Sequence, residues 1–174
     1  MDTGLRTLEE PRDETAVRRA RNYRRVGLGL VALAVVAGLA GVLGIRSATT
    51  SDSGGGSRLE VEHAQVTRAG IAVPFHVRVE QPGGFAGPVR LAISADLMER
   101  FDFQNFYPNP SKETADGRFL TYEFDPPSGD RFEMSLDART APDQNGSWAT
   151  YAVRLLDPDD TVTASVSFRM VVVP

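Results

Sequence analysis

Three aspartates near the end of the chain stand close enough together to hold a divalent cation. They are Asp157, Asp159 and Asp160, and carboxylate oxygens are the ligands that Ca²⁺ prefers in proteins. The segment lacks the glycine and the regular Asp-x-Asp-x-Asp spacing of a calcium-binding loop, and aspartate is also a frequent turn residue. The pattern therefore favours a hairpin turn, with these three residues as the candidate metal ligands.

Residues that commonly catalyse reactions are scarce. The chain has no cysteine, which excludes a disulfide, a thiolate metal site and a cysteine nucleophile. Of its two histidines, His63 falls on an inward-facing position of a predicted strand and His76 on an outward-facing one. Their side chains should therefore not converge on one metal or substrate. Gly-x-Ser-x-Gly, His-Glu-x-x-His, Walker and dinucleotide-binding patterns are all missing from the sequence. We therefore expect neither an enzyme nor a bound cofactor.

An aromatic segment is the candidate binding site for a partner. Residues 95–117 form an irregular stretch between predicted strands, and four closely spaced aromatics lie in it: Phe101, Phe103, Phe106 and Tyr107. If they are exposed, they can anchor a partner protein, because aromatics dominate interface hot spots. The alternative is an extra short strand and a helical turn whose aromatics cover the core. Tyr107 and Trp148 are the candidate platforms for a sugar.

Alternating apolar and polar residues predict the elements that must position these side chains. The inward parity recurs in seven segments separated by turn residues, which are 59–63, 71–79, 89–93, 120–124, 132–138, 149–155 and 162–172. We predict an all-β domain, an Ig-like antiparallel β-sandwich of about seven strands, with a closed barrel as the alternative. Pro74 cannot donate to a central ladder, so its segment should be an edge, a strand start or a bulge.

One apolar run predicts a membrane segment. Residues 26–45 contain no charged side chain, and twenty helical residues rise about 30 Å, the thickness of the hydrocarbon layer. Five arginines precede the run, Arg18, Arg19, Arg21, Arg24 and Arg25, and only Arg46 follows it closely. Basic residues are enriched on the cytoplasmic side of membrane helices, so we predict a single-pass plasma-membrane protein with its N-terminus in the cytoplasm. A cleaved signal peptide is the competing interpretation.

The rest of the domain plan follows from composition. Residues 1–25 read as a disordered cytoplasmic tail, 46–57 as a Gly/Ser/Thr linker of flexible coil, and 58–174 as the extracytoplasmic domain. Small residues at four-residue spacing in the apolar run could pair two helices in a homodimer, and they include Ala34, Ala37, Gly38 and Gly41.

Residues 58–174 carry eleven basic and seventeen acidic side chains, a net charge of −6, which disfavours nucleic acid and close adhesion to an anionic membrane.

A family resemblance rests on residues 124–155. The Pro-Pro-Ser-Gly-Asp turn, the Phe-x-Met-x-Leu strand, the Asn-Gly turn and the following strand resemble the bacterial Ig-like domains of the DUF11-like and CARDB-like type. The layout and the strong preference for arginine over lysine resemble single-pass membrane proteins of unknown function from GC-rich, actinobacterial-like bacteria. The resemblance implies an extracytoplasmic stalk or binding module without catalytic residues. Our first hypothesis is a membrane-anchored interaction module that acts as an accessory subunit of an envelope complex. The alternative is a cell-surface binder of carbohydrate or calcium.

Overall fold

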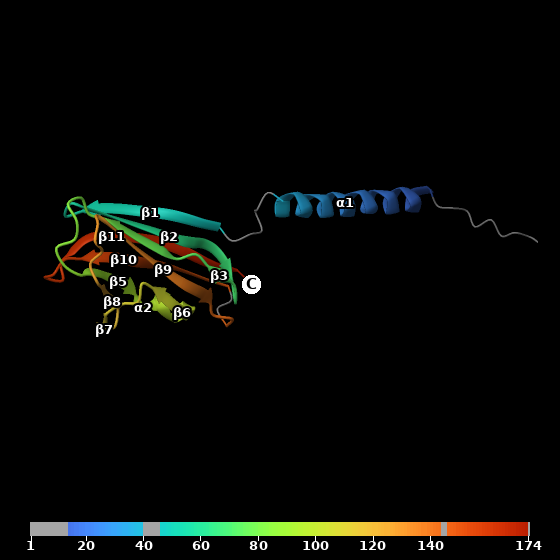
Figure 1. The fold of residues 1–174 in the computed structure, drawn as a ribbon. Helices are drawn as coiled ribbons and strands as arrows, with labels where there is room; N and C mark the ends of the chain where they lie inside the picture. The colour runs from blue at the N-terminus through green and yellow to red at the C-terminus, as the bar shows by residue number, and fades with distance from the viewer. Residues whose placement is uncertain (1–13, 40–45, 144–145, 174) are drawn as a thin grey trace, which may run out of the picture. The chain divides into compact units, whose positions relative to one another are not determined.

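The computed structural model describes residues 14–39, 46–143 and 146–173, which fall into two compact units. One unit holds a single helix, α1, and the other, the β domain, holds all the strands and a short helix, α2 (Figure 1). In chain order the elements are α1 Glu14–Leu39, β1 Arg46–Gly54, β2 Ser57–Arg68, β3 Ala72–Val73, β4 His76–Glu80, β5 Val89–Ser94, α2 Ala95–Arg100, β6 Phe101–Tyr107, β7 Lys112–Ala115, β8 Phe119–Phe124, β9 Arg131–Thr140, β10 Ser147–Leu156 and β11 Val162–Val173.

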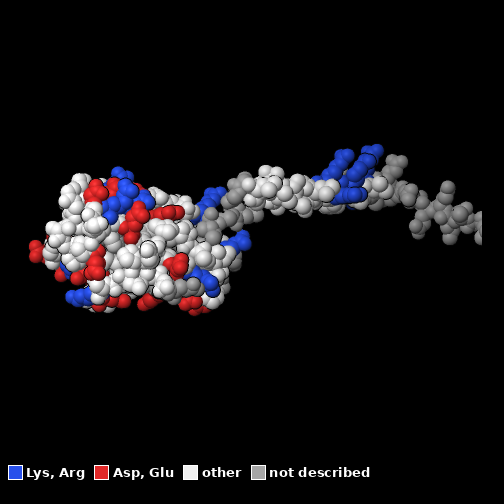
Figure 2. Space-filling view, viewed as in Figure 1, with Lys and Arg blue, Asp and Glu red and all other residues white. Residues whose placement is uncertain are grey.

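Helix α1 is long and apolar enough between Val17 and Leu39 to cross a membrane, which confirms the predicted apolar helix at the level of length and composition. Its start differs from the prediction. Residues 14–25 were expected to be disordered, but they continue the helix, because alanine and arginine are strong helix formers. Residues 40–45 of the predicted span lie outside the described residues. Figure 2 shows the basic side chains gathered toward the N-terminal part of α1, with uncharged residues after them.

The strands of the β domain form one curled sheet, which confirms the all-β prediction. Its order is β3-β9-β4-β2-β11-β10-β5-β8-β7, with β1 paired to β2 and β6 paired to β9. Every pairing is antiparallel except a short parallel contact between β2 and β11. Among the described residues the sheet has eleven strands instead of about seven, because β1, β6 and β7 add to the predicted set and the second segment, 71–79, is divided into β3 and β4.

The core lies where the two halves of the curled sheet face each other. Most inward residues of the predicted strands are buried, whereas Ile71 and Val162 at strand starts are exposed. Phe168 on β11 packs against Phe75 from the opposite half at 6.4 Å between ring centroids. Phe124 and Phe132 meet in the same way at 5.1 Å. The period-two pattern therefore assigned these faces correctly. Pro74 lies between β3 and β4, as expected for an interruption in the ladder.

Strand β1 corrects the predicted linker. Residues 46–54 are not a coil but pair with β2 along their whole length, from Arg46 opposite Val66 to Gly54 opposite Ser57. On its other side β1 is joined to β11, because the Asp52 carboxylate accepts the Ser165 amide proton at 2.8 Å. This hydrogen bond lowers the pKa of Asp52. Backbone pairing and one exposed hydrogen bond thus replace the apolar side chains that the segment lacks.

Candidate functional site

The outer face of β2, β4 and β9 carries a cross-strand ladder of charged side chains. Glu60, Arg78 and Glu133 are register partners on these three strands. The Arg78 guanidinium donates through one NH group to Glu60 at 2.9 Å and through Nε to Glu133 at 2.9 Å. The bond and charge of Glu133 raise the pKa of Arg78. Exposed ion pairs stabilise a fold little, so the value of this ladder lies in holding its side chains in a fixed arrangement.

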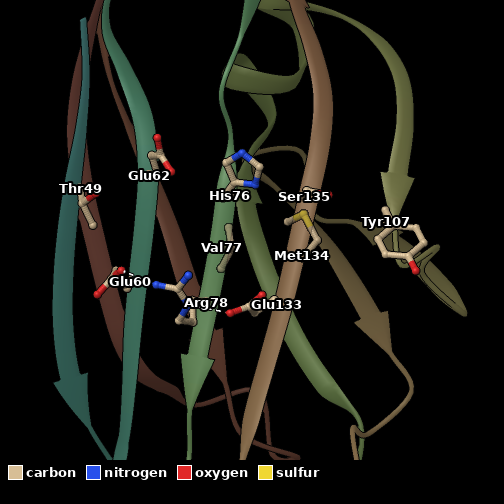
Figure 3. Close-up of a pocket in the computed structure, with 10 residues that line it drawn as sticks. All are labelled: Thr49, Glu60, Glu62, His76, Val77, Arg78, Tyr107, Glu133, Met134 and Ser135. Carbon is tan, nitrogen blue, oxygen red and sulfur yellow. Dashed lines mark hydrogen bonds and ion pairs between the residues drawn. The ribbon is translucent and has the colours of Figure 1, made fainter.

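A second row next to this ladder completes the site. Glu62, His76, Ser135 and Tyr107 are successive register partners on β2, β4, β9 and β6. The two rows border a shallow hollow of about 440 Å³, and Figure 3 shows its lining, which is Thr49, Glu60, Glu62, His76, Val77, Arg78, Tyr107, Glu133, Met134 and Ser135. Most of these side chains are polar, and Tyr107 stands at the β6 border. The hollow therefore suits a polar surface that can hydrogen-bond, such as that of another protein.

The predicted aromatic cluster is not one exposed surface. Phe101 is buried, and Phe106 is partly buried against Tyr122 with ring centroids 4.7 Å apart. Tyr107 is 79% exposed, and the side chain of Phe103 lies outside the described residues. The structure thus corrects the partner-binding assignment for Phe101 and Phe106, because β6 uses these two rings to cover the core. Only Tyr107 keeps that assignment among the described side chains.

The aspartate turn is held together by its own side chains. The Asp157 carboxylate accepts the amide protons of Asp159 at 2.9 Å and Thr161 at 2.8 Å, and Asp160 pairs with Arg90 at 2.6 Å. Asp160 also adopts a φ of 63°, a conformation that aspartate tolerates in turns. Among the described residues no group of three His, Asp or Glu side chains is placed to hold a metal ion. These contacts support the turn interpretation.

The two histidines lie on opposite faces, as their parity predicted. His63 is 3% exposed, stacks on Phe168 at 4.1 Å between ring centroids, and lies 3.1 Å from the Thr50 hydroxyl through Nε2. Burial lowers the pKa of His63, because the charged imidazolium is poorly solvated there. His76 faces outward into the hollow described above. The pair therefore cannot form one catalytic or metal site.

The predicted helix residues are exposed where they are described. All five clustered arginines, from Arg18 to Arg25, are exposed on α1. Ala34 and Gly38 are exposed and Ala37 is half-buried, while Gly41 lies outside the described residues. The small side chains are thus available for contact with a second helix.

Sequence reasoning did not single out the charged ladder, although a signal for it exists. Outward positions of three predicted strands are charged, as Glu60 and Glu62, Arg78 and Glu80, and Arg131 and Glu133 show. Only the strand order reveals that opposite charges face each other. No protein-family model matches the chain, and neither does any curated protein, so the DUF11-like and CARDB-like resemblance stays a prediction.

Proposed function

We propose that the chain is a single-pass membrane protein whose β domain lies outside the cytoplasm and binds another envelope protein as an accessory subunit. The observation that carries the proposal is the bare apolar surface of α1. Leu28, Leu30 and Leu33 are each more than 60% exposed, and none of the apolar stretch is buried. Such a continuous apolar surface needs a cover, and its length matches a bilayer.

The arginines support the orientation. Five basic side chains precede the apolar stretch, and cytoplasmic flanks of membrane helices are enriched in lysine and arginine. The β domain has its own core, so it does not need α1 to fold around. A tethered domain also meets neighbouring membrane proteins at an effective concentration of about mM, which makes a weak contact sufficient.

The partner surface in this proposal is the charged ladder together with Tyr107. Tyrosine and arginine are enriched in interface hot spots, and here Tyr107 lies in the row next to that of Arg78. The ion pairs of Arg78 with Glu60 and Glu133 hold the charges in place before a partner arrives. Less side-chain freedom is then lost on binding.

Photo-crosslinking in native membranes tests the partner surface. A benzoylphenylalanine replacing Tyr107 should form a discrete adduct with one envelope protein. The matched control carries the same group at Val162, which is 43% exposed on β11 and outside the ladder. Equal adducts at both positions, or none at Tyr107 in a folded protein, would contradict the proposal.

Protease protection tests the topology separately. In intact spheroplasts, a tag at the C-terminus should be cleaved by added protease, and one at the N-terminus should be protected. The reverse pattern would overturn the orientation. Release of the β domain from the membrane fraction would instead indicate that the apolar segment is a cleaved signal peptide.

A further inference from the structure

The single tryptophan of the chain is exposed in a way that core packing does not explain. Trp148 lies near the start of β10 with 69% of its surface exposed. The Arg169 guanidinium carbon lies 5.3 Å from the centre of the Trp148 ring, which is a cation–π contact. Indole and guanidinium together form an amphipathic unit, with an apolar ring beside a fixed positive charge.

Strand register places this unit at the end where the chain enters the β domain. Trp148 is opposite Val171, Val171 is opposite Val66, and Val66 is opposite Arg46, the first residue of β1. Three strand spacings separate Trp148 from Arg46, which is about 14 Å. Arg46 follows the last described residue of α1 by seven positions, a reach of at most about 25 Å. At most about 40 Å therefore separates Trp148 from the last described residue of α1, so chain connectivity leaves Trp148 within reach of a bilayer that α1 crosses.

Charge is also distributed so that this end can approach a membrane. Strands β10 and β11 contain Arg154 and Arg169 but no acidic residue, although the β domain as a whole is acidic. The aspartate turn at Asp157 lies at the other end of β10, about 30 Å along the strand from Trp148. The three acidic side chains of that turn, Asp157, Asp159 and Asp160, thus lie away from Trp148.

We infer that Trp148 and Arg169 form a lipid-interface anchor of the β domain. The indole inserts among the headgroups of the bilayer that holds α1, and the Arg169 guanidinium binds a lipid phosphate. Tryptophan is enriched at this depth of membranes because its ring is amphipathic, and arginine binds phosphate through several donors. This inference rests on the membrane anchoring proposed above, and it adds a second contact that fixes which end of the β domain faces the bilayer.

Tryptophan fluorescence of the full-length protein tests the anchor without any added label. The protein is inserted into phosphatidylcholine–phosphatidylglycerol vesicles, with or without brominated acyl chains close to the headgroups. Bromine should quench Trp148 emission, and aqueous iodide should not. The control variant, Trp148→Phe with Tyr107→Trp, moves the single tryptophan to the charged ladder and should show the opposite pattern. Arg169→Glu should reduce quenching by bromine, whereas Arg169→Lys should retain most of it.

Flotation of the same vesicles separates failure of the anchor from failure of the proposed function. If the protein floats but iodide quenches Trp148 and bromine does not, the anchor is overturned and the membrane protein stands. If the protein floats and neither reagent quenches, Trp148 is covered by protein, which also overturns the lipid contact. If the protein does not float, both proposals fall.

Discussion

Replacing Gly54 by alanine tests whether residues 46–54 are a strand of the β domain or a linker. A Cβ at Gly54 would overlap the carbonyl oxygen of Thr163 and lie 3.1 Å from its carbonyl carbon. Both atoms are backbone atoms of β11, so no flexible side chain can move aside. Either the end of β1 detaches from Ser57, or β11 shifts. Overpacking of this kind costs about 1–3 kcal/mol, which lowers the melting temperature of a domain of this size by roughly 4–12 °C.

Thermal melting of the full-length protein in detergent, followed by the circular dichroism of the strands, measures this effect. Gly87→Ala is the matched control, because a Cβ there has no neighbour within 4 Å. In a flexible linker, Gly54→Ala would instead be neutral or slightly stabilising, since alanine restricts the unfolded chain. Equal melting temperatures for the two variants would refute the assignment of 46–54 as a packed strand.

Four further predictions follow from burial and exposure. Burial lowers the pKa of His63, so its contribution to the free energy of unfolding should be complete above pH 6.5 and should fall as the pH drops below that value, by about 1.4 kcal/mol per unit of pKa difference between folded and unfolded protein. Urea unfolding of wild type and His63→Phe across this pH range measures the effect. The same dependence of unfolding free energy on pH in both proteins would contradict it. Burial raises the pKa of Tyr122, so alkaline unfolding should begin above pH 10 and coincide with the delayed part of the tyrosine absorbance titration. Phe106→Ala should lower the free energy of unfolding by up to about 3–5 kcal/mol, because the Phe106 ring packs against the core. Tyr107→Ala should leave the melting temperature nearly unchanged, because Tyr107 is exposed. Gly38→Leu should abolish crosslinking between two copies of α1 in membranes, and Gly29→Leu, on the opposite face of the helix, should not.

Side-chain pattern predicted the parts of the fold that bury large apolar residues. Val153 and Phe168 belong to predicted inward positions, and both are buried in the core. Strand β1 could not be found in this way, because it contains no large apolar residue on either face and is held by pairing with β2. Strand β7 is exposed at every position and gives no periodic signal either.

The candidate site was less predictable than the core because it depends on strand order. The outward charges of each strand can be read from its sequence, but the position of β4 between β2 and β9 cannot. Without that order, Arg78 cannot be assigned to Glu60 and Glu133. Phe106 illustrates the opposite problem, since an aromatic in an irregular segment has the same sequence signal whether it binds a partner or fills a gap beside Tyr122.

The pairing of β1 with β2 has a consequence for mechanical load. Antiparallel hydrogen bonds run perpendicular to the strands, and β1 begins at the point where the chain arrives from α1. A pull on that point along the axis of β1 would strain all the rungs between the two strands together, as in shear, and not one after another, as in unzipping. Under a pull in that direction, the first strand of the β domain would resist detachment through all its hydrogen bonds to β2 at once.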